Sequence, residues 1–243
     1  MTLDRILAIS TRLVLQVRHD HRSVGLIVGA PVMVMALVGF SFADRADILN
    51  RIAPALIATF VLFFTFLLTA VSFLRERMHG TLERMLVTPV SRGDILFGYL
   101  LGFVPFAAVQ AIAILTFTVL ALQVQYQGSL WHLLIVLLPL VVVAVNLGIF
   151  VSMFARNEFQ VIQFIPIVLV PQIFLSGIVL PTEEMPSYFQ AISRVMPLRY
   201  GVDGLQDIML RGIGLSGVIS EIAILVGFGL ALLLLASVTL SRR

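Results

Sequence analysis

The chain has 243 residues, of which 60% are hydrophobic and 12% are charged, with a mean hydropathy of +1.07, and this composition predicts an integral membrane protein because soluble domains are only about 45–50% apolar. The formal net charge is +3, and all sixteen basic residues are arginines scattered along the chain, which argues against a nucleic-acid-binding module with its compact basic patch. No cysteine is present, which excludes a disulfide framework and any thiolate metal site.

The first segment is predicted to be an amphipathic helix that lies along the membrane surface. Its apolar residues share one helical face and its charged residues lie on the other. The apolar face comprises Leu3, Ile6, Leu7, Leu13, Val14 and Val17, and the charged face comprises Asp4, Arg5, Arg12 and Arg18. Basic amphipathic helices of this kind lie in the headgroup plane. A disordered basic tail is the alternative, but it does not explain the periodic spacing.

Six membrane-spanning helices follow from the apolar runs that carry no charge, since a helix needs about 20 such residues to cross the hydrocarbon core. The long run 95–155 holds two spans, because the polar stretch 123–129 is typical of a tight turn. The predicted spans are 24–42, 52–74, 95–122, 131–154, 159–180 and 218–240. The first of these apolar segments is too long to be the apolar core of a cleaved signal peptide, and it begins too far from the N-terminus. We therefore expect an all-α membrane protein with a single transmembrane domain over residues 1–243.

The arginines predict the orientation of these spans, because basic residues are retained in cytoplasmic loops. With six spans both termini lie on the same side of the membrane. Eleven arginines fall on that side and five on the opposite side. Both termini are therefore expected in the cytoplasm.

The predicted cytoplasmic loop 75–94 is longer than a simple chain reversal requires. Gly80 permits a turn, and residues 81–87 form a short amphipathic helix with Leu82, Met85 and Leu86 on its apolar face. Thr88 and Pro89 end this helix, and Ser91 with Asp94 forms a capping box that opens the next span. Physical reasoning alone leaves two readings open: a loop that docks on a partner below the membrane, or an ordinary connection.

The predicted exterior segment 176–212 carries two short helices before the last span. Ser187 and Gln190 read as a capping box for a helix that ends before Pro197, and a second helix then runs to Gly212. We expect these two helices to dip back towards the membrane as a re-entrant pair, where irregular backbone is tolerated only under a cover of protein or beside a cavity.

Few polar residues lie within the spans, and they allow two interpretations. The candidate substrate path comprises Phe60, Phe63, Phe64, Thr65, Thr69, Gln110, Asn146 and Gln163. Amides and hydroxyls commonly bond between helices in membranes, so helix packing is the alternative and is favoured. The glycine pairs Gly25/Gly29 and Gly98/Gly102 fit close helix approach, more readily within the chain than against a second copy.

Two of these segments resemble type-2 ABC exporter permeases. The stretch from Arg75 to Ser91 is similar to the loop that supplies the coupling helix of that family, a helix that sits in a cleft of the ATPase subunit. The resemblance assigns ATPase coupling to Gly80, Thr81, Leu82, Glu83, Arg84, Met85 and Leu86. Glu83 and Arg84 would make the polar contacts.

The exterior segment resembles the extracellular re-entrant gate of the same family. The residues that match its pattern are Ser176, Gly177, Pro181, Pro197, Leu198 and Tyr200. Arg199 departs from the pattern, in which this position is usually small or uncharged. The resemblance implies a plasma (inner) membrane protein that works as two permease copies with separate ATPase subunits. ATP and Mg would be used by those partners, and this chain would bind no cofactor or metal.

Absences separate the remaining classes of function. No ionisable residue lies near the centre of a predicted span, which disfavours an ion-coupled carrier. The chain has no lysine and hence no P-loop, and it has neither a His-Glu-x-x-His zinc motif nor a Gly-x-Ser-x-Gly elbow, so we do not expect an enzyme. The sequence therefore predicts the permease subunit of an ATP-driven exporter of amphipathic drugs, lipids or similar substrates. A non-transporting membrane scaffold or assembly factor is the alternative.

Overall fold

The structure is a computed structural model that describes residues 3–42 and 44–241, apart from the side chains of residues 21–24, 83, 86 and 241. Within those ranges it consists of helices and connecting turns, without a strand, which confirms the predicted all-α class. The helices are α1 Leu3–His19, α2 His21–Ser41, α3 Ala46–Met78, α4 Thr81–Leu86, α5 Arg92–Leu120, α6 Leu130–Ser152, α7 Glu158–Leu175, α8 Ser187–Ser193, α9 Pro197–Arg211 and α10 Ile219–Ser241, with 3-10 turns at Thr182–Glu184 (η1) and Leu215–Gly217 (η2).

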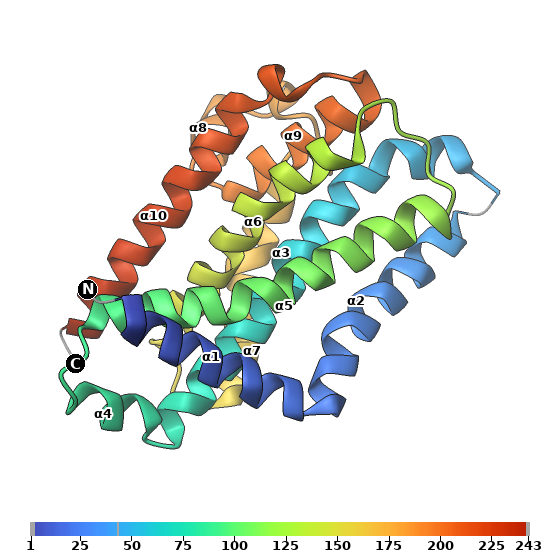
Figure 1. The fold of residues 1–243 in the computed structure, drawn as a ribbon. Coiled ribbons are helices and arrows are strands. Elements are labelled where there is room, and N and C mark those ends of the chain that lie inside the picture. Colours follow the sequence, from blue (N-terminus) through green and yellow to red (C-terminus); the bar gives the residue numbers. More distant parts are fainter. Residues whose placement is uncertain (1–2, 43, 242–243) are drawn as a thin grey trace.

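Helix α3 is the central element of the bundle and packs most extensively against α6 (Figure 1). The two backbones approach closely where Gly148 of α6 lies on α3. A Cβ added to Gly148 would lie 2.0 Å from Thr69 Oγ1 and 2.8 Å from the Phe66 carbonyl oxygen. Small residues at such crossings are typical of membrane helices, where close backbone packing replaces the hydrophobic effect.

Five of the described helices are long and apolar enough to cross a membrane: α3, α5, α6, α7 and α10. The apolar part of α2, Gly25–Ser41, is shorter, so the sixth span stays a prediction. The observed α3 extends beyond the predicted span 52–74 at both ends. The predicted span 159–180 is too long, because α7 ends at Leu175, before Gly177 with its positive φ of 84°.

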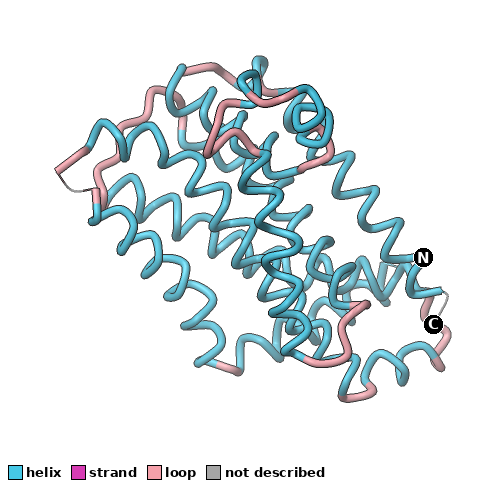
Figure 2. The backbone as a smooth tube through the Cα atoms, turned by 180° about the vertical axis from the view of Figure 1, so that it is seen from behind, coloured by secondary structure: helices cyan, strands magenta, loops and turns pink. Residues whose placement is uncertain are grey.

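The polar connections gather at two opposite ends of the bundle. Helices α1 and α4 lie at one end with the last turn of α10, and α8 and α9 lie at the other (Figure 1). The view from behind shows the same separation of the loops (Figure 2). We call the first the α4 end and the second the α9 end.

Helix α1 packs across α5 on a seat made by two glycines. Ile9 and Leu13 lie over Gly98 and Gly102, where an added Cβ would come within 2.7 Å and 2.5 Å of their side chains. The Gly98/Gly102 pair therefore packs within the chain, as predicted. A Cβ added to Gly25 or to Gly29 would meet no atom of another segment within 4 Å, so that pair makes no such contact here.

The amphipathic helix predicted at the start of the chain is present, but its apolar residues do not all share one environment. The buried side chains of α1 are Ile6, Ile9 and Leu13, whereas Leu3 and Leu7 remain exposed. The apolar face of α1 therefore packs against α5 along one side only, and its other side remains exposed.

Candidate functional site

Helix α4 is a short element between two long helices, and its sequence sets both of its ends. Gly80 precedes it with a φ of 70°, a conformation that glycine adopts without steric cost. Ser91 then caps α5: its hydroxyl accepts a hydrogen bond from the Asp94 amide, and the Asp94 carboxylate accepts one from the Ser91 amide. This confirms the predicted capping box and the predicted short helix.

The predicted coupling residues of α4 divide between the interior and the surface. Leu82 is only 3% exposed and belongs to the chain's own core, so it does not present the outward apolar contact assigned to it. Met85 packs partly against that core, whereas Arg84 is exposed. The side chains of Glu83 and Leu86 lie outside the described residues. Thr81, like Gly80, is half-buried.

An exposed apolar residue that the coupling assignment did not include follows α4 directly. The Val87 side chain is 87% exposed, and no regular helix continues beyond it before Ser91. The sequence could have indicated this residue, because Val87 is the last residue of the predicted amphipathic helix.

Helix α1 is joined to the α4 end by polar contacts on both sides. The Arg5 guanidinium donates a hydrogen bond to the Pro89 carbonyl in the turn after α4. Arg12 Nη2 lies 2.7 Å from Glu76 Oε2, near the last turn of α3. Gln16 Nε2 donates to the other Glu76 oxygen at 2.9 Å.

Tyr99 completes this network from α5. Its hydroxyl donates to Glu76 Oε2 at 2.9 Å and accepts a hydrogen bond from Arg12 Nη2 at 3.1 Å. The Glu76 side chain is 7% exposed, and a buried carboxylate requires such charge-assisted partners. Glu76 therefore ties α1, α3 and α5 together, a role that the sequence reasoning missed although Glu76 lies within the Arg75–Arg77 motif.

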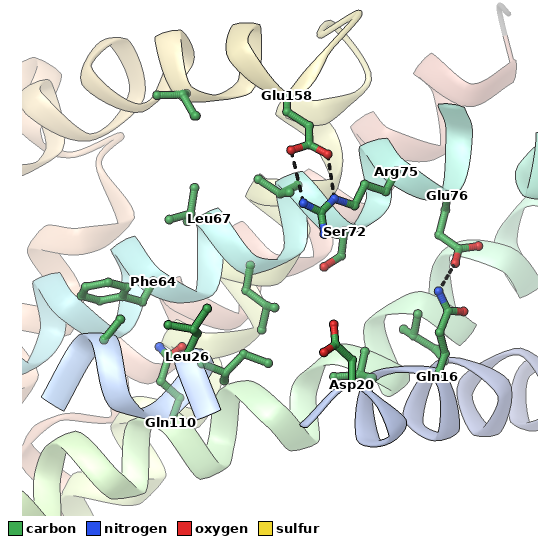
Figure 3. Close-up of a pocket in the computed structure, with 17 residues that line it drawn as sticks. Gln16, Asp20, Leu26, Phe64, Leu67, Ser72, Arg75, Glu76, Gln110 and Glu158 are labelled. Atoms are coloured by element: carbon green, nitrogen blue, oxygen red, sulfur yellow. Dashed lines mark hydrogen bonds and ion pairs between the residues drawn. The ribbon is translucent and has the colours of Figure 1, made fainter. Parts of the chain in front are cut away.

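A cavity of about 500 Å³ lies beside this network (Figure 3). Its walls come from α1, α2, α3, α5 and α7. An ion pair at the edge of the cavity joins α3 to α7. In it, Arg75 Nε lies 2.7 Å from Glu158 Oε1. Both side chains of this pair are about half exposed.

Only two residues of the predicted substrate path line that cavity, Phe64 and Gln110. Phe60 and Phe63 are partly buried and stack edge-on against Phe64, with ring centroids 6.3 Å and 4.7 Å from it. Gln110 Nε2 donates to Thr65 Oγ1 at 3.3 Å. These residues form one group near the middle of α3.

The other predicted path residues lie elsewhere. The Thr69 hydroxyl donates to carbonyls of its own helix, so it serves packing. Asn146 Nδ2 donates to the Gly229 carbonyl of α10 at 2.9 Å and lines a separate, apolar cavity of about 400 Å³. Gln163 is exposed on α7. The structure therefore does not bring the whole predicted path together.

The predicted gate residues gather at the α9 end. Pro197 opens α9, and the buried Leu198 amide donates to Gln172 Oε1 of α7 at 3.3 Å. Ser176 is buried at the end of α7, and Pro181 precedes η1. Tyr200 Oη donates to the Arg194 carbonyl at 2.8 Å, and its ring centroid lies 6.0 Å from that of Phe228.

One detail of this end differs from the sequence prediction and one agrees with it. The capping box of Ser187 and Gln190 is wrong: Pro186 is the residue before α8, and Gln190 Nε2 donates instead to the Met185 carbonyl at 2.9 Å. The rigid φ of Pro186 starts the helix without a hydroxyl cap. The predicted second helix is confirmed as α9, which ends at Arg211, and Gly212 directly after it has a φ of 66°.

Arg199, the residue that departs from the gate pattern, is accounted for by local partners. Its Nε lies 3.4 Å from Asp203 Oδ2 one turn along α9, and its Nη1 donates to Ser193 Oγ at 2.6 Å. Burial raises the pKa of the Asp203 carboxyl to about 6, against the opposing effect of Arg199. The nearby carboxylates Asp207 and Glu221 add to this rise.

Among residues 3–42 and 44–241, no group of histidine, aspartate and glutamate side chains is arranged to hold a metal ion. What the structure offers is an outward element at one end, a packed pair of short helices at the other, and a cavity between helices. These features suit binding and movement of helices.

Comparison with known proteins connects these features to one family. The family model described as ABC-2 type transporter matches residues 4–210. One relative is ABC transporter G family member 20 of Dictyostelium discoideum, 27% identical over 70% of this chain and 23% of its own length. Another is the probable multidrug ABC transporter permease YbhR of Escherichia coli (strain K12), 29% identical over 68% of this chain and 45% of its own length.

The inner membrane transport permease YhhJ of the same bacterium is 30% identical over 67% of this chain and 44% of its own length. The chain thus spans less than half the length of each of these relatives. The family match nevertheless runs from α1 through α9 and includes α4, the Glu76 network and the cavity. The chain therefore belongs to the ABC-2 type transporter family and is a multi-pass membrane protein.

Proposed function

We propose that this chain is the membrane subunit of an ATP-driven exporter. The observation that carries the proposal is the family match over a helical bundle that presents α4 and the exposed Val87 at one end. A separate ATPase subunit would bind there and supply the energy, as the resemblance of the Arg75–Ser91 stretch to the coupling loop of type-2 ABC exporter permeases implies. ATP and Mg belong to that partner.

The mechanism follows from the contacts of α4. Closure of two ATPase subunits would push on the coupling helices of two permease copies. Leu82 is buried in the core below, so α4 would pass the push to α3 and α5 rather than slide over them. The Glu76 network would carry the same displacement into α1, since it holds α1, α3 and α5 by direct bonds.

The remaining parts have the roles that the family resemblance implies. The bundle would cross the plasma (inner) membrane six times, with α2 as the first span and the α4 end in the cytoplasm. The α8 and α9 pair would be the re-entrant exterior gate. The substrate would be an amphipathic drug, lipid or similar molecule, and the drug class agrees with the name of the YbhR relative, a probable multidrug permease.

The test is to purify the tagged chain from its native host, identify an associated ATPase by its nucleotide-binding loop, and reconstitute both in proteoliposomes. The chain alone should hydrolyse no ATP, and the complex should hydrolyse ATP and move an amphipathic dye across the bilayer. An ATPase variant without its catalytic carboxylate is the control. Association without any ATP-dependent transport would favour the scaffold function and overturn the proposal.

A further inference from the structure

The smaller cavity, of about 400 Å³, lies between α5, α6 and α10 and shares no lining residue with the larger one. Four of its lining side chains are about half exposed, so it opens on the side of the bundle. They are Ile135 and Leu138 of α6, and Val226 and Leu230 of α10. The three helices are long and apolar enough to cross a membrane. The opening would therefore face the hydrocarbon core, and a molecule dissolved in the bilayer would reach the cavity from the side.

The lining of this cavity is apolar apart from one side chain. Among the described residues that line it, only Asn146 has a polar side chain and none is charged. A charged group would lose its hydration here and gain no opposite charge in return, which is unfavourable. Ligand pockets have volumes of about 300–1,000 Å³, so the cavity is large enough for a small ligand. It suits a neutral and mostly apolar molecule.

Asn146 has one half of its amide without a partner. The residue is 1% exposed, and its Nδ2 donates to the Gly229 carbonyl at 2.9 Å. This bond fixes which way the amide points, because Oδ1 cannot bond to a carbonyl oxygen. Oδ1 itself has no hydrogen-bond partner among the described residues. Buried polar groups are nearly always hydrogen-bonded, so the free acceptor calls for a donor.

A ligand explains this acceptor better than a water molecule does. Buried waters typically make about three hydrogen bonds, and the apolar lining offers few further partners. Pro139, also in the lining, has no N–H, so the Ile135 carbonyl does not receive its helical hydrogen bond. The polar groups that this wall leaves over are thus acceptors, and they favour a ligand that donates.

The position of Asn146 along α6 indicates how such a ligand lies. About 9 Å of helix separates Asn146 from Ser152 at the α4 end, so the amide lies inside the hydrocarbon core, below the level of charged head groups. About 16 Å of α6 separates it from Ile135 at the other end of the cavity. This length accommodates an extended alkyl chain.

We propose that this cavity binds a single-chain neutral lipid with a free hydroxyl group. The hydroxyl donates to Asn146 Oδ1, and the chain lies between α6 and α10 from Asn146 towards Ile135. This inference goes beyond the proposed export function, because the cavity is separate from the one that Phe64 and Gln110 line. Binding there needs neither ATP nor a partner, so it is measured independently of transport.

The site is located with a long-chain alcohol that carries a photoreactive diazirine in its chain. Illumination of the full chain in phosphatidylcholine nanodiscs should attach this probe within residues 135–146 and 222–233. Dodecanol should compete with the probe. Its methyl ether, which cannot donate a hydrogen bond, should need a concentration about three- to tenfold higher. Equal competition by the alcohol and the ether would overturn the proposed hydrogen bond, and attachment elsewhere would overturn the site.

The role of Asn146 is tested by Asn146→Leu, which keeps a similar volume and removes the acceptor. In this variant the alcohol should compete only as well as the ether does, and competition by the ether should be unchanged. Weaker competition by both compounds, or by neither, would show that Asn146 serves only to hold α6 against α10.

The cavity itself is tested by filling it from the opposite helix. Val226→Trp leaves Asn146 intact and should lower labelling by about tenfold, with the melting temperature unchanged. Leu234→Trp is the control, because Leu234 is exposed on α10 but does not line the cavity. Equal labelling of the two variants would place the alcohol on the general lipid-facing surface. Labelling that is lost when two copies share a nanodisc would make the cavity a subunit interface. Either result would overturn the lipid site.

Discussion

Glu76 accepts hydrogen bonds from Arg12, Gln16 and Tyr99, so removal of one carboxylate affects three helices. Glu76→Ala should lower the free energy of unfolding by about 2 kcal/mol, because it leaves a half-buried guanidinium without its charged partner. Tyr99→Phe should cost about 1 kcal/mol, since only one hydroxyl is lost. Thermal unfolding of the purified chain in detergent measures both.

The exposed ion pair of Arg75 and Glu158 serves as the control for the buried Glu76 network. Both side chains are about half exposed, so Glu158→Ala should cost less than about 1 kcal/mol. If the Glu158 variant unfolds at a lower temperature than the Glu76 variant, the network does not hold the helices together.

Asp203 makes stability depend on pH at the α9 end. Its pKa is raised to about 6 from the ordinary aspartate value of 3.8, chiefly by burial, so the charged form is less favourable in the folded chain than in the unfolded chain. The stabilising contribution of this group is complete below about pH 3.8 and is lost as the pH rises through about 6. Asp203→Asn removes that dependence. The melting temperature of the variant minus that of the parent chain should therefore increase as the pH is raised from 5 to 7.5. A difference that does not change with pH would contradict the raised pKa.

At the scale of elements, the contact of α3 with α6 has almost no spare volume at Gly148. Gly148→Ala places a methyl group within 2.0 Å of Thr69 Oγ1 and against the backbone of α3. Overpacking of this kind typically costs about 1–3 kcal/mol. Gly25→Ala in α2 meets no atom within 4 Å and should be neutral or slightly stabilising. Melting temperatures that fall equally in the two variants would argue against the close crossing.

Helix α4 makes a prediction about coupling that does not involve stability. Val87→Asp puts a charge on the exposed apolar side chain and should reduce stimulation of the partner ATPase by about tenfold, while yield and melting temperature stay unchanged. Val195→Asp, at a side chain 60% exposed near the opposite end, is the control. Normal coupling in the Val87 variant would leave α4 as an ordinary connection.

For the whole molecule, the orientation of the bundle can be tested because the chain has no cysteine. Single cysteines at Thr88, Gln127 and Ser187 occupy exposed positions, the first near α4 and the other two at the opposite end. An impermeant thiol reagent added to intact cells should label the second and third and spare the first. Labelling of Thr88→Cys alone would invert the proposed topology.

The sequence predicted what depends on local patterns. Apolar runs predicted the long helices. Gly80 predicted the start of α4, Ser91 the start of α5 and Gly212 the end of α9, because helix ends depend on residues close in the chain. Contacts between distant segments could not be read in this way. Arg12 lies 64 residues from Glu76 and 87 from Tyr99, and no periodicity relates them. The inward orientation of Leu82 likewise depends on packing against the core.

The uninterrupted length of α3 makes it a lever. Its 33 residues correspond to about 50 Å, and it passes from the α9 end directly to α4. Gly148 of α6 contacts α3 at Thr69, which lies nearer to the α4 end of α3 than to its other end, and this crossing would form the pivot. A tilt of about 5° around Thr69 would shift the end near α4 by about 1 Å and the far end by about 3 Å in the opposite direction, if the helix stays straight. A small displacement of α3 at the α4 end would then move its far end in the opposite direction, without any change in the hydrogen bonds of the helix.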